Sequence, residues 1–185
     1  MKTLKQFFLA FIAILTFTSC GNDDTPSIVV EEEVITTLRA TLTPNAGTTS
    51  IILESRDADG DGPNAPVISV SGNLLANTVY SGSIEVLNEI ANEDITEEIK
   101  EKDQEHQFFF IASNNIAVFS YNDKDANGKP VGLLFTLETG DAGNGEITIT
   151  LVHEPAKEAN GVSDGDITNA GGEEDITVTF PIIVE

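Results

Sequence analysis

The feature that most constrains the fold is an alternation of side chains with a period of two. In residues 34–43, one set of alternate positions includes Val34, Leu38 and Leu42, and the other set is mostly threonine. Successive side chains of a β-strand point to opposite faces of the sheet, so this pattern predicts a half-buried strand. Runs of the same kind predict further strands at residues 48–55, 66–71, 79–88, 108–111, 116–122, 132–139, 145–153 and 175–184.

Two of these runs carry additional information about burial. The run from Phe108 to Ile111 is apolar at every position, which predicts the most buried strand of the chain. The last run contains Pro181, whose nitrogen has no hydrogen to donate to a neighbouring strand. That position therefore predicts an edge strand or a bulge.

Residues 92–105 depart from the alternation. Ile95 and Ile99 lie four positions apart, and Asp94 followed by Glu97 fits a variant of the capping box. We therefore predict one short helix near residues 94–104. Because repeated strand–helix units are absent, the chain predicts an all-β fold, an antiparallel Greek-key (immunoglobulin-like) sandwich of eight or nine strands.

The N-terminal segment indicates export. Lys2 and Lys5 precede an apolar run over residues 7–17, and small residues precede Cys20. The run is shorter than the roughly 20 residues that span a bilayer. The pattern resembles a bacterial lipoprotein signal peptide, in which the cysteine carries a fatty acyl group such as palmitate. It predicts three parts of the chain, a signal peptide at 1–19, a lipidated acidic tether at 20–33 and a sandwich domain at 34–185.

Charge and cysteine content exclude several function classes. The chain has 31 acidic and 9 basic residues, with a formal net charge of −22. Such a charge repels nucleic acid and anionic lipid, and it favours cations and basic proteins as partners. Cys20 is the only cysteine, so lipidation there would leave no thiol for a disulfide, a zinc site or a nucleophile.

Two aspartate-rich loops resemble the start of calcium-binding loops. Each has carboxylate or amide side chains at alternate positions followed by glycine, and calcium takes six to eight oxygen ligands. The candidate ligands are Asp57, Asp59 and Asp61 in the first loop and Asp123, Asp125 and Asn127 in the second. Both loops lack the final glutamate of an EF-hand, which excludes that motif. Turn formation alone also favours Asp, Asn and Gly, so both interpretations stay open.

Histidines supply a second candidate metal site. His153 continues the apolar phase of the run at 145–153, and His106 precedes the phenylalanine run. If the fold brings them together, they could hold a transition metal or a heme, since imidazole is a common ligand. The alternative is a histidine that is satisfied at a strand end.

Signatures of catalysis are missing. The sequence has no G-x-S-x-G elbow, no H-E-x-x-H motif and no phosphate-binding glycine loop. Carboxylates are abundant enough for a hydrolase of the two-carboxylate kind, but no pair is singled out. We therefore predict that the protein is not an enzyme.

Several stretches together resemble small flavobacterial (Bacteroidetes) surface lipoproteins. The stretches are "CGNDD", "EEEVITTLRATLTP", "SRDADGDGPNAPV", "YSGSIEVLNE", "ITEEI…EHQFFF" and "NAGGEEDITVTF". Members often carry the label "type 1 periplasmic binding fold superfamily protein". That fold has two α/β lobes with parallel sheets, which neither the length nor the alternation of this chain supports. The resemblance implies an exported lipoprotein that works beside an outer-membrane TonB-dependent receptor.

The function that we predict first is a non-enzymatic binding or accessory module. It is anchored in the outer membrane and faces the periplasm or the cell surface. Loops on a rigid sandwich commonly carry recognition, and the candidate loops are 57–66, 123–130, 140–145 and 155–174. The alternative is a structural or adhesive surface module that calcium stabilises, and a hydrolase is the third hypothesis.

Overall fold

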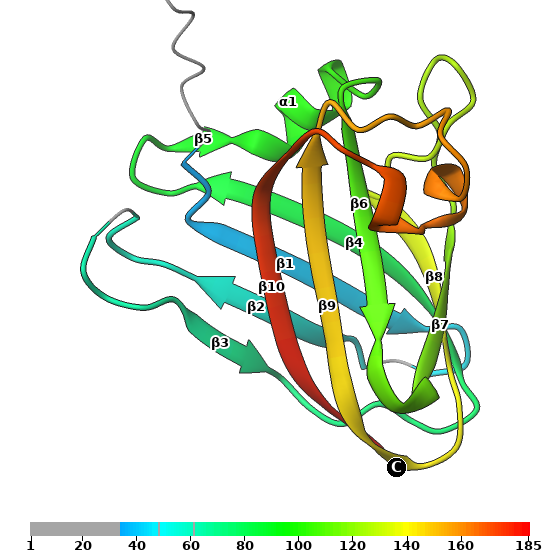
Figure 1. The fold of residues 1–185 in the computed structure, drawn as a ribbon. Coiled ribbons are helices and arrows are strands. Elements are labelled where there is room, and N and C mark those ends of the chain that lie inside the picture. The colour runs from blue at the N-terminus through cyan, green and yellow to red at the C-terminus, as the bar shows by residue number, and fades with distance from the viewer. Residues whose placement is uncertain (1–33, 48, 61) are drawn as a thin grey trace, which may run out of the picture. The chain divides into compact units, whose positions relative to one another are not determined.

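The computed structural model describes residues 34–185 except 48 and 61. The predicted signal peptide, the acidic tether, Cys20 and Asp61 lie outside the described residues. The described chain is an all-β sandwich of two antiparallel sheets with one α-helix (Figure 1). No helix in this part of the chain is long and apolar enough to cross a membrane.

The larger sheet has the strand order β3-β2-β1-β4-β8-β7, and the two-residue strand β5 pairs with β4. Its strands are β1 (Thr37–Pro44), β2 (Ile51–Arg56), β3 (Val67–Val70), β4 (Val79–Asn88), β5 (Glu93–Asp94), β7 (Ala117–Tyr121) and β8 (Leu134–Thr139). Alternate side chains of β1 are buried, as the period of two predicts. Strand β4 does not pair with the preceding strand β3 but with β1, on the side of β1 opposite to β2. The immunoglobulin-like Greek-key connectivity stays a prediction.

The smaller sheet has the order β10-β9-β6 and crosses the strands of the larger one (Figure 1). Its strands are β6 (His106–Ala112), β9 (Gly143–His153) and β10 (Glu173–Val184). Strand β10 lies at the edge of this sheet and has a bulge between Glu174 and Ile176. The prediction from Pro181 is therefore confirmed, since this residue lies in an edge strand.

The core lies between the two sheets. Its largest buried side chains come from both sheets and from the helix, and include Leu38, Tyr80, Ile99, Phe108, Phe135 and Phe180. The helix α1 (Ile95–Glu101) is shorter than predicted, and its Ile95 and Ile99 are buried as their spacing indicates. The Asp94 side chain caps it by accepting a hydrogen bond from the backbone N–H of Thr96.

Residues 154–172, which we call the covering segment, pack on the outer face of the smaller sheet. The segment contains two 3₁₀ turns, η2 (Val162–Asp164) and η3 (Ile167–Asn169). Its Val162 and Ala170 form a second apolar cluster with Phe109 of β6 and Val152 of β9. Both faces of β6 are therefore covered at Phe108 and Phe109, which confirms the predicted burial of this strand there. The prediction fails at Ile111, which is 50% exposed because the covering segment does not reach the end of the strand.

Candidate binding groove at the open strand edges

Two strands expose an edge on the same side of the sandwich. In the described chain β6 pairs only with β9, and β7 pairs only with β8. The short 3₁₀ turn η1 (Ser113–Asn115) separates the two strands in sequence, and they lie side by side in Figure 1. A hollow of about 370 Å³ lies between these edges.

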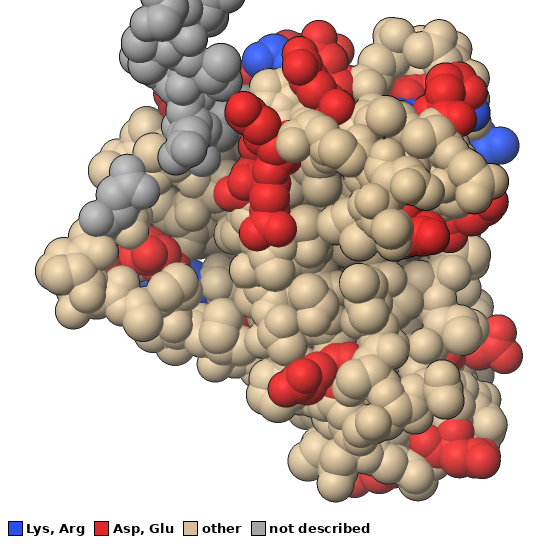
Figure 2. All heavy atoms as spheres, in the orientation of Figure 1, with Lys and Arg blue, Asp and Glu red and all other residues tan. Residues whose placement is uncertain are grey.

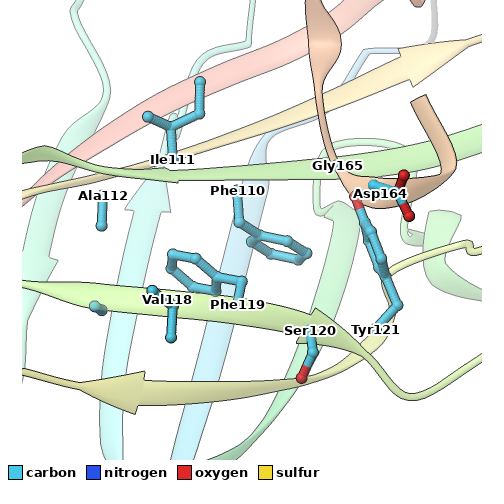
Figure 3. Close-up of a pocket in the computed structure, with 10 residues that line it drawn as sticks. Phe110, Ile111, Ala112, Val118, Phe119, Ser120, Tyr121, Asp164 and Gly165 are labelled. Atoms are coloured by element: carbon cyan, nitrogen blue, oxygen red, sulfur yellow. The ribbon is translucent and has the colours of Figure 1, made fainter. Parts of the chain in front are cut away.

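Aromatic side chains line this hollow. Phe110 from β6 and Phe119 from β7 point toward each other (Figure 3), and their rings stack with centroids 5.1 Å apart. The Tyr121 hydroxyl donates a hydrogen bond of 2.7 Å to the carbonyl oxygen of Phe108. Burial raises the pKa of Tyr121 to about 12, so the hydroxyl keeps its proton and this donor role at neutral pH.

Unpaired main-chain groups face the hollow from both sides. In an antiparallel pair, the residues of one strand alternate in pointing their N–H and C=O toward the partner strand. The N–H of Phe108 points away from β9 and donates to the carbonyl oxygen of Val131. By the alternation, the main-chain N–H and C=O of Phe110 also point away from β9. The backbone N–H of Asn122 donates to the carbonyl oxygen of Leu134 in β8. By the same alternation, the main-chain N–H and C=O of Phe119 point away from β8.

A second hollow of about 610 Å³ continues from the first. It lies between the loop at 122–130 and the covering segment. The two hollows share four lining residues, Phe119, Ser120, Tyr121 and Asp164. We call the two hollows together the groove. One half of it is mainly apolar, and the other half carries charged side chains from two loops.

The second aspartate-rich loop forms the wall of the groove through internal hydrogen bonds. Asp123 accepts hydrogen bonds from the backbone N–H groups of Gly132 and Leu134, at 2.7 and 2.9 Å. Asn127 donates to the side chain of Gln104. These oxygen and amide groups are already engaged without an ion, and calcium at this loop stays a prediction.

Asp125 forms a buried ion pair with Lys157 of the covering segment. The distance from Lys157 Nζ to Asp125 Oδ2 is 3.0 Å, and the side chain of Lys157 is 6% exposed and that of Asp125 is 1% exposed. Lys157 also donates to the carbonyl oxygen of Asp103 at 2.6 Å. Burial acts to raise the pKa of Asp125, but the hydrogen bonds from the Lys129 backbone and from Lys157 outweigh it and lower the pKa. A side-chain cation thus neutralises this aspartate.

The first aspartate-rich loop lies on the far edge of the larger sheet, between β2 and β3, and does not line the groove. Asp57 accepts a hydrogen bond from the backbone N–H of Asp59 at 3.2 Å. The Asn64 side chain donates to Asp59 at 2.7 Å and lowers the pKa of that carboxyl group. The predicted calcium site there is incomplete in the described residues, because Asp61 lies outside them.

The structure brings His106 and His153 together across β6 and β9. The two residues are register partners, and their rings stack at 4.8 Å with an interplanar angle of 12°. The Nδ1–H of His106 faces the carbonyl oxygen of Lys102, and burial lowers the pKa of His106. The lone pairs of an imidazole lie in the plane of its ring, and the planes of these two rings are nearly parallel. Both rings would therefore have to turn before their nitrogens could bind one metal ion. Within the described residues, no group of three or more metal-ligating side chains is arranged to hold a metal.

Several groove residues were not among the candidates from the sequence. The loops at 123–130 and 155–174 were expected to make contacts and do border the groove, whereas the loop at 140–145 lies near the other end of β7. Phe110, Phe119 and Tyr121 have the phase of core residues, and only the meeting of two strand edges makes them groove residues. No known protein family, curated protein or solved structure matches this chain.

Proposed function

We propose that this protein is an outer-membrane lipoprotein, anchored through Cys20, that acts as a non-enzymatic binding or accessory module. In this role it works beside an outer-membrane transporter of the TonB-dependent kind. The observation that carries the proposal is the groove between the open edges of β6 and β7. It combines an aromatic lining, unpaired main-chain groups and a charged end, which are the usual parts of a recognition site.

The walls of the groove are held in place before any partner arrives. The Phe110–Phe119 stack and the Tyr121 hydrogen bond join the two sheets across the open side. The Lys157–Asp125 ion pair joins the covering segment to the loop at 122–130. A preorganised site loses little conformational entropy on binding, which supports a binding role.

Surface charge favours a basic partner. Acidic side chains are spread over the face drawn in Figure 2, and basic side chains are few there. With a net charge of −22, the chain attracts cationic surfaces over distances of about a Debye length and speeds encounter with them.

Site-specific photo-crosslinking tests this function in intact cells. A photoreactive phenylalanine at Phe119, which lines both hollows and whose ring points toward Phe110 (Figure 3), is expected to form an adduct with an outer-membrane transporter. The control position is Ile183, which is half exposed on β10, at the other edge of the smaller sheet. Mass spectrometry identifies the adducts. Equal adducts from both positions, or no adduct from Phe119, would contradict the proposal.

A further inference from the structure

We propose that the groove binds an extended polypeptide segment of a partner protein, which pairs with the edge of β7 and places a basic side chain beside Asp164. The inference rests on the proposed binding function and names the class of its ligand. Three features of the groove carry it: main-chain groups without partners, an alternating arrangement of the lining, and an unpaired acidic side chain.

The main chain of β7 is available for pairing. Phe119 directs its N–H and C=O away from β8, by the alternation established at Asn122. No hydrogen bond to these two groups occurs on the open side among the described residues. An unpaired strand edge is a template for a further strand, and extended peptides commonly bind in this way. The main chain of Phe110 offers the same groups from the opposite wall.

The lining suits the side chains of an extended segment. Phe119 and Tyr121 lie two positions apart on β7, so both point to the same face and line the groove (Figure 3). Val118 and Ser120 point to the opposite face of the sheet, where their side chains are exposed. A strand added beside β7 would therefore place alternate apolar side chains on the aromatic rings and its other side chains in solvent.

An acidic side chain at one end of the first hollow favours a basic residue in the bound segment. Asp164 is the only charged residue that lines the first hollow within the described chain. The Asp164 side chain is exposed and forms no ion pair among the described residues. Two lysines line the second hollow, Lys129, which is paired with Glu158 at 2.8 Å, and Lys124, which is exposed. A lysine or arginine of the incoming segment can therefore reach a free carboxylate.

The same charges argue against a second copy of this chain as the occupant. A strand pair between two copies would bring together two molecules that each carry a net charge of −22. Like charges at an interface oppose association. A basic segment from another protein meets no such repulsion.

Peptide binding to the purified protein tests the inference. The probe is a fluorescein-labelled peptide of alternating valine and threonine with one arginine near one end, and the readout is fluorescence anisotropy. A matched peptide carries N-methyl groups on alternate residues along one edge, which removes the main-chain donors there. We expect the N-methylated peptide to lose binding, because strand pairing needs those donors.

Protein variants test the acidic end. We expect Asp164→Lys to weaken binding of the arginine peptide roughly five- to tenfold, because an attraction becomes a repulsion. Glu138→Lys is the matched control, since Glu138 is exposed on the outer face of the neighbouring strand β8. It makes the same change of charge and is expected to alter the dissociation constant less than twofold.

Each contrary result has a distinct meaning. Equal binding of the N-methylated peptide would overturn strand pairing, and unchanged binding by Asp164→Lys would overturn the charge selection. A dimer that forms with rising concentration and excludes the peptide would favour a second copy. If a transporter is crosslinked at Phe119 while no peptide binds, the inference about the ligand fails and the proposed function stands.

Discussion

Removal of the buried ammonium group of Lys157 tests how the covering segment is held. The substitution Lys157→Met keeps a long side chain and removes only the charged end. It leaves Asp125, whose side chain is 1% exposed, without its ion-pair partner. The carboxylate retains hydrogen bonds from the backbone N–H groups of Asn127 and Lys129, both at 2.9 Å.

The expected cost follows from burial. Breaking a buried ion pair by removing one partner typically costs about 3–5 kcal/mol. Two N–H donors still stabilise the carboxylate of Asp125, so we expect about 3 kcal/mol, at the lower end of that range. For a protein of this size, such a loss lowers the melting temperature by about 6–12 °C.

Thermal and urea unfolding of the purified protein measure this cost. The control is Lys124→Met, because Lys124 is exposed on the same loop, and we expect it to change stability by less than about 0.5 kcal/mol. The double variant Lys157→Met, Asp125→Asn removes both charges and is expected to be less destabilised than the two single variants added together. A Lys157→Met protein as stable as the parent, or strict additivity in the double variant, would refute the reasoning.

Four further outcomes are expected. Gly82→Ala should cost about 1–3 kcal/mol in urea unfolding, because its Cβ would lie 2.3 Å from ring atoms of the buried Phe135. His106→Gln should reduce the pH dependence of the free energy of unfolding. The folded-state pKa of His106 lies below its ordinary 6.5, so its contribution to stability is present above pH 6.5. That contribution is lost as the pH falls below 6.5 toward the folded-state pKa. On the calcium hypothesis, millimolar calcium should raise the melting temperature of the parent protein but not of Asp59→Ala, as thermal scans with and without a chelator would show. Cys20→Ser should abolish incorporation of labelled palmitate and move the protein from the membrane fraction to the soluble fraction.

The strands could be predicted because their signal is local. The run from Thr37 to Pro44 alternates between faces regardless of what packs against it, and its observed bounds lie close to the predicted ones. The two-residue strand β5 is too short to carry a period, and the sequence does not reveal it. The helix was predicted from the spacing of Ile95 and Ile99, but its end depends on tertiary packing.

The groove could not be predicted because it depends on which strand edges meet. Phe119 and Tyr121 look like ordinary core residues in the sequence. Their main-chain groups are unpaired only because β7 is an edge strand of the larger sheet, next to the edge strand β6 of the smaller sheet. Lysine is rarely buried, so nothing local marks Lys157 as the partner of Asp125. The sequence indicates the contact between His106 and His153 only as something the fold could produce. Whether it forms depends on the antiparallel register of β6 and β9, which the sequence does not specify.

The far edge of the smaller sheet is partly closed to a further strand. Leu74 and Ala76 donate backbone hydrogen bonds to Ile183 and Glu185 at the end of β10, and Pro181 lacks an N–H at the position where β10 would next offer one. The C-terminal end of β10 is therefore closed to a strand from a second molecule. A further strand at this edge would have to pair with the part of β10 that precedes Pro181.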